Sequence, residues 1–152
     1  LDAHPELGNN ACLATVLGAR VTGAFDTGTA RPLGMVGELP EPLPLDTVVE
    51  RVTAGLGRQP VVVAGGEHPV RQLAWCSGAG QGFIDHVSQL GVDLYLSGEI
   101  SEPTVHTARE CGLHYLAAGH HATERGGVAV LGEHLAATLG LEHRFIDVDS
   151  PA

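Results

Sequence analysis

The fold is decided by residues 92–124, VDLYLSGEISEPTVHTARECGLHYLAAGHHATE. The apolar run at residues 92–96 predicts a buried strand, and the helix expected from about Pro103 to Cys111 carries proline in its first turn. Residues 114–118 predict a second strand, after which a long helix begins near His120. Strands separated by helices need crossover connections, which give parallel strands covered by helices.

The same alternation extends outward on both sides of this stretch. Residues 26–44 interrupt it, because they are rich in glycine, proline and threonine. We expect a connector or an irregular edge segment there and no central strand, since proline cannot donate a ladder hydrogen bond. The other expected elements are helices over residues 9–17, 46–56, 81–90 and 120–139, and strands over residues 19–25, 60–64, 70–76 and 142–148. Together they predict a three-layer α/β/α fold with a mostly parallel or mixed sheet.

Composition restricts the class of protein. With 152 residues, 43% apolar and 17% charged, the chain fits a globular protein with a proper core. Its net charge of −10 makes nucleic acid an unfavoured partner, because phosphates would be repelled. No apolar run approaches the roughly 20 residues that a membrane-spanning helix needs, so we expect no membrane association. Cys12, Cys76 and Cys111 form no Cys-x-x-Cys pair, and we expect small buried side chains in a reduced, cytoplasmic setting.

The strongest chemical signal is the pair His120 and Glu124. Four residues apart on a helix, they point the same way and lie within reach of one cation, although such pairs also occur on solvated helix faces. The neighbouring His121 and the position after a strand end favour the metal interpretation. If Asp2 joins them, the ligand set suits iron(II), manganese, nickel or zinc. Calcium is disfavoured by the imidazole, and a structural zinc site would use thiolates.

Two further strand ends carry polar residues. The turn Ser77 to Gly80 would present backbone N–H groups to an anion, or it is simply a tight connection. Glu99 is a candidate general base, or else a solvated loop carboxylate or helix cap. His106 lies within the next helix and either faces the same pocket or packs as a partly buried histidine. Because the carboxyl ends of parallel strands meet at one edge, we expect a pocket there.

With these positions assembled, the chain resembles the C-terminal part of the NIF-three-like dinuclear metal-centre family, whose members are often named GTP cyclohydrolase type 2 homologues. The resemblance is most specific in Leu1–Asn10, in Val92–Ala108 and in Ala118–Gly127, where Gly-His-His-Ala-Thr-Glu is the strongest match. It implies two divalent metal ions (Fe, Mn, Zn or Ni), with metal ligands at Asp2, His120 and Glu124. The family's N-terminal histidine pair has no counterpart here and would lie upstream of Leu1.

The resemblance also implies a toroidal homohexamer, a cytoplasmic location and two similar, interleaved α/β halves. On this basis residues 1–30 are expected to be the remnant of an N-terminal α/β half whose start is missing. The chain opens without an initiator methionine, which agrees with that expectation. Residues 31–152 are expected to form an α/β domain, in which residues 113–152 are able to pack back on the N-terminal half.

Three functional hypotheses follow. The first is a metal-dependent hydrolase of the GTP cyclohydrolase type 2 kind, acting on a nucleotide or another phosphorylated small molecule. Asp2, His120 and Glu124 would be its metal ligands and Glu99 or His106 its catalytic proton carrier. The second is a non-catalytic metal-binding hexameric ring that acts as an interaction or metal-handling protein. The third is a folded α/β module without activity of its own.

Overall fold

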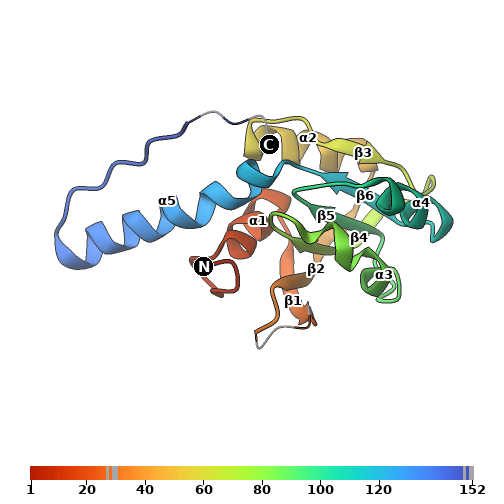
Figure 1. The fold of residues 1–152 in the computed structure, drawn as a ribbon, viewed down its shortest axis with the longest axis horizontal. Coiled ribbons are helices and arrows are strands. Elements are labelled where there is room, and N and C mark those ends of the chain that lie inside the picture. The colour runs from red at the N-terminus through yellow and green to blue at the C-terminus, as the bar shows by residue number, and fades with distance from the viewer. Residues whose placement is uncertain (27, 29–30, 149, 151–152) are drawn as a thin grey trace.

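The computed structural model describes residues 1–26, 28, 31–148 and 150. Within them, six strands form one mixed sheet in the order β1-β2-β4-β5-β6-β3 (Figure 1). The three central strands are parallel and the flanking strands antiparallel. The strands are β1 (Arg20–Phe25), β2 (Gly34–Leu43), β3 (Val61–Val63), β4 (Val70–Cys76), β5 (Leu94–Ser97) and β6 (His114–Ala117).

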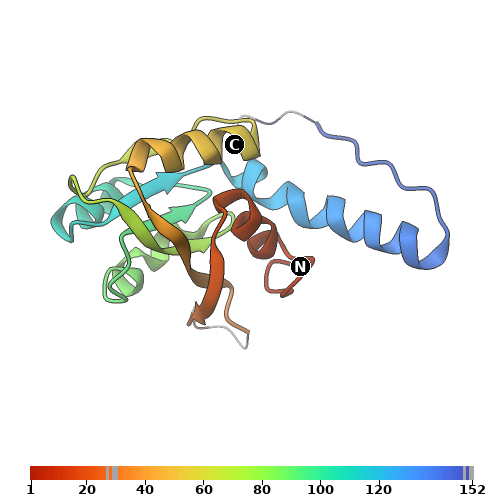
Figure 2. The same cartoon turned by 180° about the vertical axis from the view of Figure 1, so that it is seen from behind.

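Helices cover both faces of this sheet, which confirms the three-layer α/β/α prediction (Figures 1 and 2). Adjacent side chains of a strand point to opposite faces. Accordingly, Trp75 of β4 belongs to one buried cluster and Ala74 to the other. The first cluster packs α1 (Asn9–Leu17), α2 (Leu45–Leu56) and the start of α5 (His120–Leu139), and the second packs η1 (Gly80–Phe83), α3 (Ile84–Val87) and α4 (Glu102–Glu110).

The expectation that residues 26–44 contain no central strand is wrong. β2 lies between β1 and β4 and pairs antiparallel with both. Its two prolines, Pro40 and Pro42, fall after Glu38, the last residue that pairs with β1, and within the irregular register between Glu38 and Leu43 on the β4 side. The missing N–H groups therefore cost no regular ladder hydrogen bonds, and the strand tolerates them.

The strand expected at residues 142–148 is also absent. That segment is described and has no regular secondary structure. It returns from the far end of α5, which extends beyond the sheet, and approaches α2 (Figures 1 and 2). Residues 145–148 lie against the first turns of α5 instead of a sheet edge, and Asp147 pairs there with Arg125. No helix in the described part of the chain is long and apolar enough to cross a membrane.

The cysteines behave differently from one another. Cys76 is buried on β4, Cys12 is half-buried and Cys111 is exposed. The expectation that all three are small buried side chains therefore holds only for Cys76.

Candidate functional site

The carboxyl ends of the three parallel strands lie level with one another. Cys76 pairs with Ser97, and Ser97 pairs with Ala117. The turns that follow touch through their glycines, since Gly98 N–H donates to Gly78 O at 2.9 Å and Gly119 N–H donates to Gly98 O at 2.9 Å. A Cβ atom on Gly98 would lie only 2.7 Å from Gly78 O. The three turns that the sequence singled out are therefore packed backbone against backbone.

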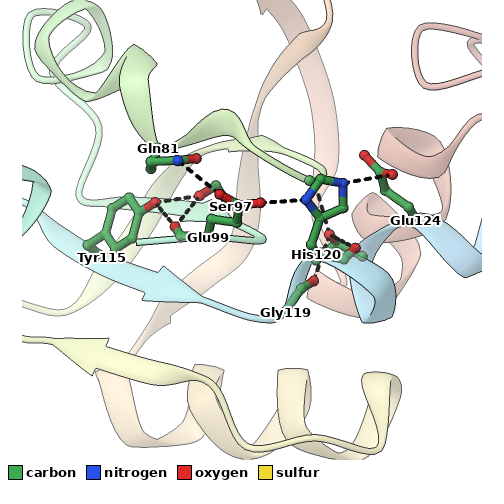
Figure 3. Close-up of polar contacts among 9 residues, drawn as sticks. Gln81, Ser97, Glu99, Tyr115, Gly119, His120 and Glu124 are labelled. Atoms are coloured by element: carbon green, nitrogen blue, oxygen red, sulfur yellow. Dashed lines mark hydrogen bonds and ion pairs between the residues drawn. The ribbon is translucent and has the colours of Figure 1, made fainter. Parts of the chain in front are cut away.

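His120 is the first residue of α5 and lies between two carboxylates (Figure 3). Its Nδ1 is 2.6 Å from Oε1 of Glu99, and its Nε2 is 3.2 Å from Oε2 of Glu124. The bond to Glu99 needs a proton on Nδ1, because a carboxylate only accepts. Nε2 is then the ring atom left to bind a proton or a metal, and it faces Glu124. The helical start at His120 thus places Glu124 on the same side, as the spacing predicted.

Glu99 is held from several directions, as Figure 3 shows. Gln81 Nε2 donates to its Oε2 at 3.0 Å. Its backbone carbonyl oxygen lies 2.6 Å from Tyr115 OH and 2.9 Å from Ser97 Oγ, and the two hydroxyls also contact each other. Because each hydroxyl has one proton, one donates to the carbonyl and the other donates either to the carbonyl or to its neighbour. Both hydroxyl-bearing residues are fully buried. The carboxylate that contacts His120 is therefore anchored to the rigid centre of the sheet.

Gly78 makes room for the pair His120 and Glu124. Its φ of +61° favours glycine, and a Cβ atom there would overlap Glu124 Oε1 and lie 3.0 Å from His120 Nε2. Its N–H donates to Thr123 Oγ1 at 3.0 Å, which fixes the turn against α5. Any side chain at this position would intrude between the imidazole and the carboxylate.

Asp2 reaches the same site from the opposite end of the sequence. Together with His120 and Glu124 it lines a pocket of about 260 Å³, whose other walls are Leu33, Cys76, Ser77, Ala79, Gly80 and Phe83. Asn9 Nδ2 donates to Asp2 Oδ1 at 2.6 Å, and Ser77 Oγ does so at 3.4 Å. The three residues expected as metal ligands therefore face one cavity.

Asn9 also fastens Asp2 to α5. Its Oδ1 accepts the N–H of Gly127 at 2.7 Å, while the side chain of Asn10 accepts Ser77 N–H at 2.9 Å. Neither asparagine caps α1, since the N-cap of this helix is Gly8 and no side-chain cap hydrogen bond is formed. Both are buried. Two adjacent polar residues on the inner side of a helix were the signal for this role.

The Ser77–Gly80 turn is a tight connection rather than an anion site. Three of its four backbone N–H groups are directed to the protein's own oxygens: Ser77 N–H to Asn10, Gly78 N–H to Thr123, and Gly80 N–H to Gly78 O at 2.9 Å. The helix that follows is a four-residue 3-10 turn. The structure thus favours the second of the two interpretations of this turn.

His106 lies apart from this group of residues. It is exposed on α4, where its Nε2 is 3.9 Å from Oε1 of Glu102. It does not line the pocket of Asp2, His120 and Glu124. Its proposed role as a proton carrier stays a prediction that the geometry does nothing to support.

The electrostatics of the site follow from these contacts. The hydrogen bond to Glu99 raises the pKa of His120, partial burial opposes this, and the charge of Glu124 reinforces it. The same bond lowers the pKa of Glu99. Burial raises the pKa of Cys76 to about 12, and the charges of Asp2 and Glu124 add to the shift. Without a bound metal, Cys76 is therefore a thiol at neutral pH.

The site offers carboxylate and imidazole donors to a cation, a set that fits the metals expected from the sequence. However, no group of three or more His, Cys, Asp or Glu side chains in the described ranges lies close enough to hold a metal ion on its own. Metal ligation by Asp2, His120 and Glu124 accordingly stays a prediction. The arrangement provides at most part of a centre.

The chain is similar to known proteins over almost its whole length. The family model described as Duf34/NIF3 (NGG1p interacting factor 3) matches residues 1–151. The protein named GTP cyclohydrolase 1 type 2 homolog from Pseudomonas aeruginosa is 49% identical over 152 residues, which are 100% of this chain and 60% of that protein. The Escherichia coli K12 protein of the same name is 49% identical over 153 residues, with the same coverage of both chains.

Solved structures agree with the sequence comparison. A structure described as protein ybgI, of unknown function, superimposes with a TM-score of 0.93 at 49% identity and covers 100% of this chain and 60% of its own. TTHA1606 from Thermus thermophilus superimposes with a TM-score of 0.83 at 36% identity, covering 99% and 59%. The chain thus spans about 60% of the length of these relatives.

Proposed function

Because this chain belongs to the Duf34/NIF3 (NGG1p interacting factor 3) family, we propose that Asp2, His120 and Glu124 are its ligands to a centre of two divalent metal ions. We further propose that the protein is a metal-dependent hydrolase of a nucleotide or another phosphorylated small molecule. The names of the relatives, which call them GTP cyclohydrolase 1 type 2 homologs, support a nucleotide as the substrate class.

The observation that carries the proposal is the orientation of His120. A metal-binding histidine typically donates its other ring N–H to a carboxylate, which fixes the tautomer and raises the basicity of the ligating nitrogen. Glu99 occupies that position at 2.6 Å from Nδ1, and Nε2 faces Glu124. A surface ion pair on a solvated helix face would not need a second, anchored carboxylate behind the ring.

The remaining donors fit a hard or intermediate cation. Asp2 and Glu124 bring two carboxylates to one pocket. A divalent ion bound at these carboxylates would supply Lewis-acid chemistry and an activated water. Within this arrangement Glu99 orients His120, Gln81 orients Glu99, and Asn9 with Ser77 holds Asp2 in place.

The test uses the protein at the full length of its gene, loaded in turn with Fe²⁺, Mn²⁺, Zn²⁺ and Ni²⁺. Each form is assayed on GTP, other nucleotides and phosphodiesters, with EDTA as the metal-free reference. We expect turnover that requires metal and that His120→Ala abolishes, while His134→Ala, an exposed histidine farther along α5, leaves it intact. Absence of metal-dependent turnover on the whole panel would count against the hydrolase.

A second candidate function is a non-catalytic metal-binding ring that serves assembly or metal handling. Exposed apolar side chains on α5 and beyond favour an assembly role, namely Val128, Leu135, Leu139 and Leu141. This function is distinguished from the first by the same variants. If the native protein turns over no substrate, and His120→Ala removes both bound metal and a partner interaction, the non-catalytic metal-binding function is favoured.

A further inference from the structure

A second pocket adjoins the candidate metal residues. Its volume is about 540 Å³, and it lies between the first turns of α5 and the returning segment of residues 145–148. His120 and Glu124 line it on one side, as they line the pocket that contains Asp2. A ligand in this second pocket would therefore touch the same imidazole and carboxylate from the other direction.

Arg125 presents a fixed guanidinium to this pocket. One of its nitrogens, Nη2, donates to the carbonyl of Leu56, and the other, Nη1, is 2.6 Å from Oδ2 of Asp147. The arginine side chain is only 29% exposed. Because the hydrogen bond to the Leu56 carbonyl fixes the planar guanidinium, the N–H groups on the Asp147 side are preorganised for an oxyanion.

His121 approaches the same carboxylate from the first turn of α5. Its Nε2 is 3.7 Å from Oδ1 of Asp147, too far for a hydrogen bond. The atom is buried and has no hydrogen-bond partner among the residues that the structure describes. Asp147 thus places one oxygen on Arg125 but makes no hydrogen bond to His121. Its carboxylate therefore uses only one of the two donors that face it.

Two arginines lie close to this pocket in an acidic chain, whose net charge is −10. Arg58, His121 and Arg125 line an adjoining pocket of about 380 Å³. The N-terminal end of α5 adds the positive end of the helix dipole. Phe145, Ile146 and Val148 of the returning segment, together with Val128 of α5, give the first of these pockets an apolar wall.

We propose that Arg125 and His121 form a subsite for the phosphate group of a small ligand, and that Asp147 occupies it as an internal counter-ion which the phosphate displaces. A phosphate carries more charge than a carboxylate and has a third oxygen, so it can engage both donors. The apolar wall would contact the carbon part of the ligand. A catalytic role for the bound phosphate compound rests on the proposed function. Phosphate binding at Arg125 and His121 does not require bound metal.

The test measures binding of inorganic phosphate, by isothermal titration calorimetry in EDTA, to the protein at the full length of its gene. Arg125→Gln should weaken binding on the order of 10- to 100-fold, as expected for loss of a charge-assisted hydrogen bond. Asp147→Asn should tighten it by about 2- to 5-fold, because an exposed competing ion pair is removed. Arg109→Gln, which changes the same charge on α4, should have no effect.

Opposite signs for the two variants are the signature of a displaced counter-ion. Unchanged or weaker phosphate binding by Asp147→Asn would overturn the proposal and leave Arg125–Asp147 as a purely structural ion pair. If Arg125→Gln does not fold, Arg125→Lys keeps the charge but loses the fork and should still bind phosphate more weakly than the native protein; native affinity would contradict the subsite. Since EDTA removes metal, failure here is distinct from failure of metal binding, which is titrated separately without phosphate.

Discussion

His114 and His120 stand at opposite ends of β6 and are held in opposite ways. His114, at the start of the strand, is fully buried. Its Nδ1 accepts the N–H of Gly65 at 3.1 Å, and its Nε2 faces the carbonyl of His68 at 2.9 Å. His120 follows the end of the strand, is partly exposed and meets carboxylates at both nitrogens.

The comparison shows how partners decide what a histidine does. His114 is locked as a neutral ring between two backbone groups, stacked on His68 with 4.1 Å between ring centroids, and it fastens the loop before β4. His120 has anionic partners and one nitrogen directed into a pocket. The structural histidine lies at the amino edge of the parallel strands and the candidate ligand at the carboxyl edge, where open α/β sheets bind their ligands.

The largest expected difference is in stability. His114→Ala removes a buried ring and leaves Gly65 N–H and His68 C=O without their partner, which should lower the free energy of unfolding by about 2–4 kcal/mol. His120→Ala should cost less than about 1 kcal/mol, because its ion pairs are partly exposed. Urea denaturation of both variants measures the two values. Equal losses of unfolding free energy in the two variants would contradict a structural role for His114 that His120 lacks.

The next effect concerns metal affinity. Glu99→Gln keeps the shape of the side chain that holds His120 Nδ1 but removes its charge, and should weaken Mn²⁺ or Zn²⁺ binding by about 10- to 100-fold. Glu102→Gln on α4, beside His106, is the matched control and should bind normally. Binding is measured by metal titration of the protein at the full length of its gene. If Glu99→Gln binds as the native protein does, Glu99 does not orient a metal ligand.

Alanine substitutions at two glycines distinguish the cost of a left-handed backbone from the effect of a side chain that enters the site. Gly78 and Gly91 have φ values of +61° and +71°, yet a Cβ atom on Gly91 meets nothing within 4 Å. Gly78→Ala and Gly91→Ala should each cost about 1–2 kcal/mol from the left-handed backbone. Only Gly78→Ala should also lose metal binding, because its methyl group would enter the space between His120 and Glu124. Loss of metal by both variants would point to a general effect on folding.

The smallest effect is in the pH dependence of stability, where the two histidines act with opposite sign. Burial lowers the pKa of His114, so its contribution is present above about pH 6.5 and is lost as the pH falls through its folded pKa. The bond to Glu99 raises the pKa of His120, so its contribution is present below about pH 6.5 and is lost as the pH rises through its folded pKa.

Unfolding free energies measured from pH 5 to 8 test these signs. His114→Asn should flatten the decline on the acid side, and His120→Ala should flatten the decline on the alkaline side. The ring NMR titrations should give a pKa above about 6.5 for His120 and below about 6.5 for His114. Reversed order of the two values would contradict the hydrogen-bond assignments.

Much of the fold was predictable because its signals are local. β4 and α5 begin and end where the sequence predicted them, at Val70–Cys76 and His120–Leu139. Glycines mark such boundaries, and Gly57 and Gly140 indeed take left-handed conformations after α2 and α5. The register of the parallel strands then follows from crossover geometry, which brings the predicted turns to one edge.

The rest depends on contacts between distant residues. β2 was missed because its prolines fall where the neighbouring ladders are irregular, and that cannot be read without knowing the partners. The strand expected at residues 142–148 was wrong because a strand pattern does not reveal that this segment packs against α5 instead of joining the sheet. In the site, the contact between Glu99 and His120 and the role of Asn9 depend on how three loops and α1 meet in space.

Asp2, His120 and Glu124 are the proposed ligands of the divalent metal. The most direct test is titration of Mn²⁺, followed by electron paramagnetic resonance, into the protein at the full length of its gene. Glu124→Gln is compared with Glu133→Gln, an exposed carboxylate on the same helix. We expect Glu133→Gln to bind Mn²⁺ as the native protein does and Glu124→Gln to lose at least one ion. Native stoichiometry and affinity in Glu124→Gln would contradict the proposed ligand set.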